Sequence, residues 1–253
     1  MPRKAREKSS NDTYHIMLRG INKQTIFEDD EDKTRFLNTL KRYKEISKYQ
    51  LYGYCLMDNH IHLLIKELEE PISESIKRIS SSYVYWYNMK YERCGHLFQE
   101  RFKSENVESI VYFLTVLRYI HQNPVKAGLA KNVFECEWTS INEYLHKVKI
   151  VDIDKVLCLF SPYRASAIKL FVNYMKKPSD DQCLDFKVKV RITDSEVIEY
   201  LHKLGIKSVS LLQQMEKENR DTTIAMLKEL NGVTVRQLSR ITGISKSTIQ
   251  RIR

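Results

Sequence analysis

Two histidines separated by one residue are the first side chains in this sequence that could do chemistry together. His60 and His62 stand in an apolar run, HIHLLIK at 60–66, which is typical of a β-strand. Side chains two positions apart on a strand point to the same face, so both imidazoles project together while Ile61 faces the core. Two neutral imidazoles on one face form half of a metal site. The alternative is two ordinary polar residues on a strand surface, because the chain has seven histidines.

A tyrosine and an asparagine one helical turn apart form the second candidate pair. The segment 109–122 (SIVYFLTVLRYIHQ) predicts a helix that stops at Asn123 and Pro124. Tyr119 and Asn123 are four residues apart, so a helix would place them on one face. A phenol can act as a covalent nucleophile, and a carboxamide oxygen can bind a metal. The alternative is a structural tyrosine, since the chain has fifteen, and the following proline leaves the direction of Asn123 open.

Two further segments carry side chains suited to nucleic acid. The aromatic run YVYWYNMKY at 83–91 could stack on unpaired bases, although its helical spacing favours a core role. The segment FQERFKSENV at 98–107 predicts a strand whose Arg101 and Lys103 could contact phosphate. A solvated strand face explains these two cations equally well.

Strands and helices alternate around these residues. The turn at Asp58 and Asn59 is too short for anything but antiparallel neighbours. The acidic run EDDED at 28–32 suits the first turn of a helix, where carboxylates favour the macrodipole, so it receives no metal role. We therefore predict an α+β fold, a ferredoxin-like antiparallel sheet with packed helices. Its strands are expected at 13–19, 50–57, 60–66 and 98–107, and its helices after 28–32, from 71–73 to about 91, and at 109–122.

The second half of the chain differs in composition. Residues 131–150 predict irregular structure around Trp138, 152–176 are mostly helical in pattern, and KKPSDDQ at 176–182 is the best candidate linker. We expect a first domain at 1–150, a helical connector and linker at 151–182, and an all-α domain at 183–253.

The last 21 residues, 233–253, have the pattern of a helix-turn-helix. Two short helices flank a turn at 242–244, and Ser245 is a natural N-cap for the second. Ile249 and Ile252 would face inward, which leaves four polar side chains outward: Lys246, Ser247, Gln250 and Arg251. The pattern favours DNA binding, and the alternative is a helical hairpin that only packs.

The charge of the chain favours a polyanionic partner. The 253 residues carry a formal net charge of +10, with a pI of about 9.2. An N-terminal arm holds Arg3, Lys4 and Arg6. Five scattered cysteines indicate a reducing cytoplasm, and no apolar stretch reaches the roughly 20 residues of a membrane helix or forms a secretory signal.

Together the motifs resemble a known pattern. LMDNHIHLLI, followed by YIHQNPVKAG at 119–128, is similar to the HUH superfamily of single-strand nucleases, in particular its REP-associated single-tyrosine transposases. The resemblance covers about residues 10–145, including YHIMLRGIN and EWTSINEYL.

The resemblance implies a metal-dependent DNA strand transferase. His60, His62 and Asn123 would hold Mg²⁺ or Mn²⁺, and Tyr119 would form a 5′-phosphotyrosine bond with single-stranded DNA beside a hairpin. As a separate hypothesis, the basic arm at Arg3, Lys4 and Arg6 would contact the hairpin phosphates. A monomer and a homodimer both remain open. Two alternatives are a DNA-binding regulator that does not cut, and a metal hydrolase that activates water without Tyr119.

Overall fold

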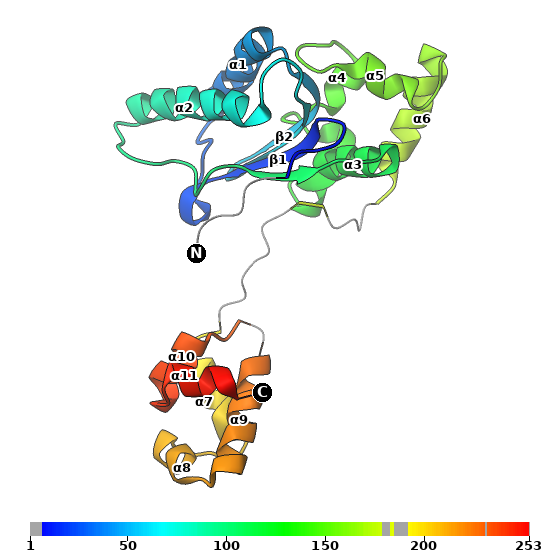
Figure 1. Ribbon diagram of the computed structural model, residues 1–253. Coiled ribbons are helices and arrows are strands. Elements are labelled where there is room, and N and C mark those ends of the chain that lie inside the picture. The colour runs from blue at the N-terminus through cyan, green and yellow to red at the C-terminus, as the bar shows by residue number, and fades with distance from the viewer. Residues whose placement is uncertain (1–6, 179–182, 185–191, 231, 253) are drawn as a thin grey trace. The chain divides into compact units, whose positions relative to one another are not determined.

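The computed structural model describes residues 7–178, 183–184, 192–230 and 232–252. The chain divides into two compact units, residues 1–185 and 186–253, each with its own apolar core (Figure 1). Both candidate pairs of side chains lie in the first unit. The domain boundary expected at residue 150 stays a prediction. In the structure, the helices that follow residue 150 pack within the first unit.

Four antiparallel strands form the sheet of the first unit, in the order β2-β3-β1-β4. They are β1 (Thr13–Arg19), β2 (Gln50–Met57), β3 (His60–Lys66) and β4 (Lys103–Asn106). With helices between β1 and β2 and between β3 and β4, this is the ferredoxin-like arrangement that the alternation of elements predicts. The strand expected at 98–107 is shorter in the structure. Phe98 forms only an isolated bridge with Gly20, and the chain bends at 99–101 before β4 pairs with β1.

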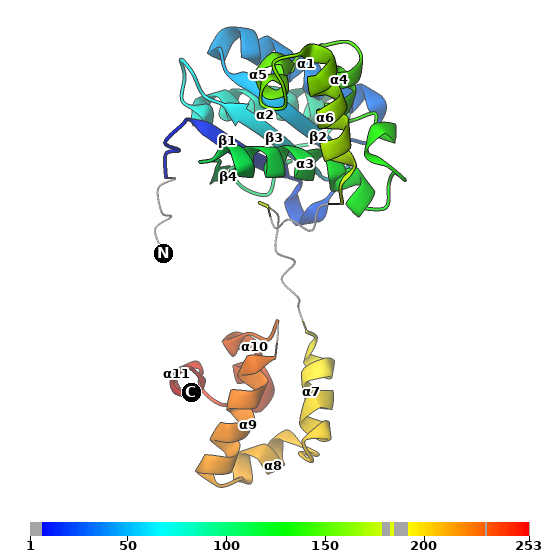
Figure 2. The same ribbon diagram turned by 90° about the vertical axis from the view of Figure 1, so that its right-hand side faces the viewer.

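Helices cover both faces of this sheet (Figures 1 and 2). Helices α1 (Asp30–Ser47) and α2 (Ile72–Lys90) lie together on one face, against alternate strand residues such as Ile16, Ile61 and Leu63. Helix α3 (Ile110–Lys126) lies on the other face, where His60 and His62 project. It approaches closely at Gly53, where a Cβ atom would come within 2.8 Å of Leu117 Cδ1.

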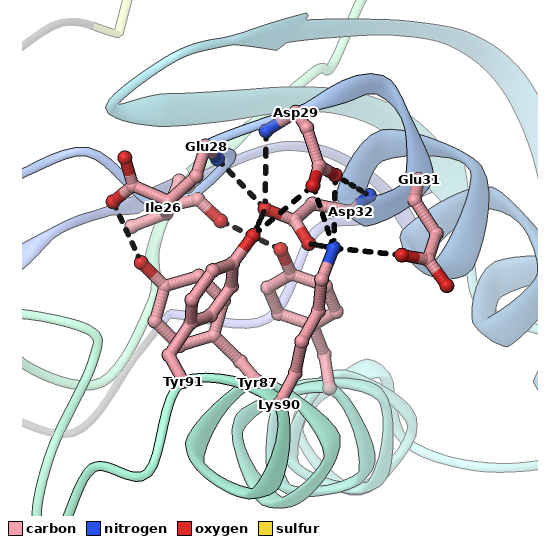
Figure 3. Close-up of polar contacts among 9 residues, drawn as sticks. Ile26, Glu28, Asp29, Glu31, Asp32, Tyr87, Lys90 and Tyr91 are labelled. Carbon is pink, nitrogen blue, oxygen red and sulfur yellow. Dashed lines mark hydrogen bonds and ion pairs between the residues drawn. The ribbon is translucent and has the colours of Figure 1, made fainter.

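The acidic run 28–32 forms the start of α1, as its position in the sequence predicts. Asp29 caps the helix by accepting from the backbone N–H of Asp32, and Asp32 accepts in return from that of Asp29. Lys90, at the end of α2, reaches Asp29, Glu31 and Asp32 at 2.8–2.9 Å (Figure 3). Burial lowers the pKa of Lys90, but its hydrogen bonds to these three carboxylates outweigh that effect and raise the pKa above its ordinary value. The cluster ties α1 to α2.

The aromatic run at 83–91 is mainly core. Tyr83 and Tyr87 are buried, and their hydroxyls donate to the Ile26 carbonyl and to the Glu28 carboxylate. The core role that their helical spacing favours is therefore the one observed for these two residues.

Helix α3 continues past the point where the sequence predicts its end. It begins at the N-cap Ser109 and runs through Pro124 to Lys126. A proline inside a helix removes one backbone hydrogen bond, at a cost of about 3 kcal/mol. Later bonds hold the turn, because Ala127 N–H donates to Asn123 O and Leu129 N–H to Pro124 O. Asn123 is therefore a buried residue within the helix and not at a frayed end.

The rest of the first unit closes the β2 side of the sheet. The segment expected to be irregular contains a short 3-10 helix, η2 (Val133–Glu135), and the helix α4 (Ile141–Leu145). Between them, the Trp138 carbonyl accepts from Leu56 N–H, and Thr139 bridges to Cys55, so this segment covers the edge of β2. Helices α5 (Ile153–Cys158) and α6 (Arg164–Lys176) confirm the helical pattern of 152–176. One further 3-10 turn, η1 (Ile21–Lys23), follows β1.

The second unit is all helical where it is described. It contains α7 (Asp194–Lys203), α8 (Val209–Gln214), α9 (Lys217–Glu229), α10 (Val235–Thr242) and α11 (Lys246–Arg251). Gly243 ends α10 in the left-handed conformation, and the Ser245 side chain accepts from Thr248 N–H to begin α11. Ile249 is fully buried and Ile252 nearly so. Within the described residues, none of the helices combines the length and the apolar character needed to cross a bilayer.

Candidate active site

The four side chains that the motifs single out converge between β3 and α3. His60 and His62 come from adjacent same-face positions of β3, and their ring centroids are 5.1 Å apart. Tyr119 and Asn123 come from one turn of α3. The ring of Tyr119 lies 5.6 Å from that of His62, and Asn123 Oδ1 lies 3.2 Å from His60 Nε2. The strand repeat places the two histidines on one face, and the helix repeat does the same for Tyr119 and Asn123. The packing of α3 against β3 brings the two pairs together.

The hydrogen bonds around His60 decide which of its nitrogens carries a proton. The Asn59 amide donates through Nδ2 to the Lys23 carbonyl, so Asn59 Oδ1 is an acceptor. That oxygen lies 2.6 Å from His60 Nδ1, which must then be the N–H. In the neutral ring the lone pair is on Nε2, and it faces Asn123 Oδ1, which is also an acceptor. Two lone pairs facing each other at this distance repel unless a proton or a metal cation lies between them.

His62 adds a third donor atom with an open lone-pair direction. Its side chain is fully buried, and its Nε2 has no hydrogen-bond partner among the described residues. Its Nδ1 lies 2.9 Å from Nε2 of the equally buried His15. Burial, followed by the nearby rings of His15 and His60, holds the pKa of His62 well below its ordinary value, so the ring is neutral.

These donor atoms fit a divalent cation. His60 Nε2, His62 Nε2 and Asn123 Oδ1 offer two imidazole nitrogens and one carboxamide oxygen, a set suited to Mn²⁺ and compatible with Mg²⁺. In the described part of the chain, no group of three or more His, Cys, Asp or Glu side chains could hold a metal. A cation bound by His60 and His62 would therefore take the Asn123 carboxamide oxygen as its third protein ligand.

A lysine lies beside the tyrosine, and an arginine lies beside His60. Tyr119 is 5% exposed, and Lys126, seven residues further along α3, places its Nζ 4.9 Å from the centre of the phenol ring. Arg19 is the direct cross-strand partner of His60, on the same face of the sheet. A phosphate beside Tyr119 and His60 would meet both cations.

Four residues of this site were not identified from the sequence alone. They are His15, Arg19, Asn59 and Lys126. The sequence held part of the signal, since His15 and Arg19 alternate with core residues in TYHIMLR in the way that His60 and His62 do. The missing information was the register, which pairs Met17 with His62 and so places His15 diagonally beside it.

The other predicted contact residues come from several segments of the chain, and of these Lys103 lies on the sheet face of the histidines, because it is a cross-strand partner of Met17, which also pairs with His62. Arg101 is exposed and lines a groove beside α2, whereas Lys103 is half-buried on β4. Arg3, Lys4 and Arg6 lie outside the described residues. His121, the other histidine of α3, is fully buried and bonds to Ser140 Oγ at 2.7 Å, so it faces away from Tyr119. On α11, all four predicted DNA contacts are exposed: Lys246, Ser247, Gln250 and Arg251.

Comparison with known proteins agrees with this geometry. Residues 8–123, which include His60, His62, Tyr119 and Asn123, match the family described as "Transposase IS200 like". This match covers most of the first unit and indicates a transposase, an enzyme that nicks and rejoins DNA.

One solved structure shares the fold of the first unit of this transposase. A REP-associated tyrosine transposase bound to a REP hairpin is 15% identical, with a TM-score of 0.51 over 57% of this chain and 86% of its own. A candidate transposase from Deinococcus radiodurans R1 is also 15% identical, over 51% of this chain and 99% of its own, but its TM-score of 0.34 is too low to support an argument. The search of curated proteins gave no match.

The buried histidines predict that acid destabilises the transposase domain. Burial lowers the pKa of His15 and of His121 to about 3. Their pKa in the unfolded chain is near 6.5, so below that pH the unfolded chain binds more protons than the folded one. The stabilisation is complete above about pH 6.5 and falls by about 1.4 kcal/mol per pH unit for each histidine as the pH drops towards 3. Urea unfolding at several pH values measures this slope.

The variant His121→Gln separates this effect from the protonation of carboxylates. The variant keeps a side chain that can bond to Ser140 but removes one group that titrates. Its unfolding free energy should fall less steeply between about pH 6.5 and pH 5 than that of the wild type. Equal slopes in the two proteins would show that His121 does not titrate in this way.

Proposed function

We propose that this transposase cuts and rejoins single-stranded DNA with Tyr119 as its covalent nucleophile and a divalent cation held by His60, His62 and Asn123. The observation that carries the proposal is the convergence of a tyrosine with three possible ligand atoms. His60 Nε2 and Asn123 Oδ1 lie 3.2 Å apart, and His62 Nε2 has no hydrogen-bond partner among the described residues. Neither a purely structural tyrosine nor a pair of surface histidines explains that arrangement.

The proposed step is a direct displacement at phosphorus. Tyr119 Oη forms a bond to phosphorus, and the bond from phosphorus to the 3′ oxygen breaks. The phenol proton leaves to solvent, and the departing 3′ oxygen takes up a proton. The products are a 5′-phosphotyrosine and a free 3′-hydroxyl. The reverse attack by a 3′-hydroxyl rejoins strands without an external source of energy, because each step exchanges one phosphodiester for another.

The residues around Tyr119 make this attack feasible. A phenol has a pKa near 10, so it must lose its proton during the reaction. The ammonium of Lys126 beside the ring favours the negative charge that develops on the phenol oxygen. Arg19 and His60 face the same region of the sheet, where the phosphate would bind. When bound, the cation neutralises phosphate charge that would otherwise repel the attacking oxygen.

The proposed substrate is single-stranded DNA beside a hairpin. The relative whose fold this chain shares was solved bound to a REP hairpin. The net charge of +10 suits any nucleic acid, and the contacts that we assign to its phosphates are Arg3, Lys4, Arg6, Arg101 and Lys103. A cytoplasmic location, where the five free cysteines would stay reduced, completes this proposal.

A nicking assay tests the proposal. Purified full-length protein is mixed with labelled single-stranded hairpin DNA from the region that flanks its own gene, with Mn²⁺, with Mg²⁺ or with a chelator. The expected products are a shortened free strand and a protein-linked strand, both only when a cation is present. Binding with no cleavage under any of these conditions would instead favour a DNA-binding regulator.

A second proposal concerns α10 and α11, which we assign to double-stranded DNA as a helix-turn-helix. The two helices and the described residues that follow them carry Arg236, Arg240, Lys246 and Arg251 and no acidic residue, whereas α7 carries mostly acids and α9 carries acids and bases in equal number. Arg240 is bound to Asp194, which leaves Lys246 and Arg251 as exposed cations of α11. With Ser247 and Gln250 they form the outward face that a recognition helix presents.

Neutralising this face should weaken duplex binding. For Lys246→Gln with Arg251→Gln, we expect a loss of about 10-fold in affinity and a salt dependence that is shallower by about two phosphate contacts. Fluorescence anisotropy with labelled duplex DNA at several salt concentrations measures both quantities. The matched control is Lys203→Gln with Lys207→Gln, which removes the same charge from the same unit but not from α10 or α11. If both double variants lose affinity equally, net charge and not this face accounts for binding.

A further inference from the structure

Two polar side chains lie behind the histidines of the proposed metal site, on the side away from the ligating atoms. Asn59 Oδ1 is 2.6 Å from His60 Nδ1, and His15 Nε2 is 2.9 Å from His62 Nδ1. The structure assigns the same role to both. Asn59 and His15 are positioning residues that hold the Nδ1 protons of His60 and His62 and leave both Nε2 atoms to bind the cation. This inference rests on the proposed metal site.

The contact at Asn59 has only one interpretation. Its Nδ2 donates to the Lys23 carbonyl at 3.4 Å, which leaves Oδ1 to accept from His60. Asn59 is the second residue of the β2–β3 turn, directly before His60. The turn that forms the hairpin therefore also fixes the tautomer and the orientation of the first histidine ring.

The contact at His15 has two interpretations, and only one permits metal binding. If His15 donates, His62 carries its proton on Nε2, which cannot then bind a cation. If His62 donates through Nδ1, its Nε2 keeps a lone pair. Within the described residues, Nδ1 of His15 and Nε2 of His62 both lack a partner, so either arrangement leaves one buried N–H unpaired. The two arrangements therefore have the same hydrogen-bonding cost without a metal. Because only the second leaves a lone pair on His62 Nε2, a bound cation selects the second.

The position of His15 suits this role. It lies on β1 two residues before Met17, the cross-strand partner of His62, and so shares a face of the sheet with it. Both rings are fully buried, so water does not compete for the hydrogen bond. The Tyr119 ring meets both, with centroids 5.9 Å from His15 and 5.6 Å from His62. His15 therefore links β1, which carries no proposed ligand, to β3, which carries two.

Metal affinity of the full-length protein, measured without DNA, tests the inference. Mn²⁺ binding is followed by electron paramagnetic resonance for the wild type, His15→Leu and His15→Gln. Leucine fills the space without an acceptor, and we expect Mn²⁺ to bind about 10- to 100-fold more weakly. Glutamine restores an acceptor oxygen near the position of Nε2 and should recover most of that loss. The pair Asn59→Ala and Asn59→Asp makes the same comparison at His60.

Nitrogen NMR of the wild type provides a second measurement that needs no variant. In protein saturated with Mg²⁺, both His60 and His62 should carry their proton on Nδ1. A proton on Nε2 of His62 would overturn the inference, as would wild-type Mn²⁺ affinity in His15→Leu. If the wild type binds neither cation, the metal site fails and the inference falls with it, whereas unchanged affinity in the variants refutes the inference alone.

Discussion

Replacing Tyr119 by phenylalanine should abolish cleavage and the protein-linked DNA product, with a loss of at least about 10⁴-fold in cleavage rate. The change removes one oxygen atom and leaves the ring, which packs against His15 and His62, in place. Denaturing gels of labelled hairpin DNA, with and without protease treatment, measure both products.

The same variant separates the proposal from its alternatives. Tyr119→Phe should still bind Mn²⁺ and hairpin DNA, because the ligand atoms belong to other residues. The matched control is Tyr112→Phe, a tyrosine of the same helix whose hydroxyl bonds to Glu105 and lies outside the ligand set. Cleavage that survives in Tyr119→Phe would indicate a metal hydrolase that activates water. Cleavage lost equally in both variants would indicate damage to α3.

Removing the second histidine should eliminate the metal site. For His62→Leu, we expect Mn²⁺ affinity to fall by more than the roughly 10- to 100-fold typical of losing an outer partner of a ligand. Cleavage should fall to near the level seen with a chelator. The physical reason is that Nε2 of His62 has no hydrogen-bond partner among the described residues, so its lone pair can bind a cation without losing another bond. Titration with Mn²⁺ and the nicking assay measure the two losses.

A matched buried histidine controls for damage to the fold. His121 is as deeply buried as His62 but bonds to Ser140 and belongs to no ligand set. His121→Gln should therefore keep Mn²⁺ affinity close to that of the wild type. If His62→Leu binds Mn²⁺ as tightly as this control does, His62 is not a ligand.

The site residues that the sequence predicted follow from the regular spacing of side chains along a single strand or helix. A strand places His60 and His62 on one face, and a helix places Tyr119 and Asn123 on one face, whatever surrounds them. The same local patterns predicted the strands β1, β2 and β3, the helices α1 and α2, and the ferredoxin-like sheet.

The parts that the sequence did not predict depend on contacts between distant segments. His15 becomes relevant only through its register against β3, and Lys126 only through the extra turn of α3. That turn forms because buried packing and the bonds after Pro124 outweigh the local preference of proline to end a helix. Similarly, β4 is shorter than predicted: it pairs with β1 only from Tyr14 to Met17, and the chain bends at 99–101 before it.

The most direct measurement identifies the atom that carries the DNA. After reaction with Mn²⁺ and hairpin DNA, the covalent product is digested with nuclease and trypsin and examined by mass spectrometry. Cleavage after Arg118 and after Lys126 releases YIHQNPVK, which contains a single tyrosine. We expect a nucleotide phosphate on Tyr119 of this peptide, present with Mn²⁺ and absent with a chelator. A nucleotide on another residue, or cleaved DNA with no modified peptide, would contradict the proposed role of Tyr119.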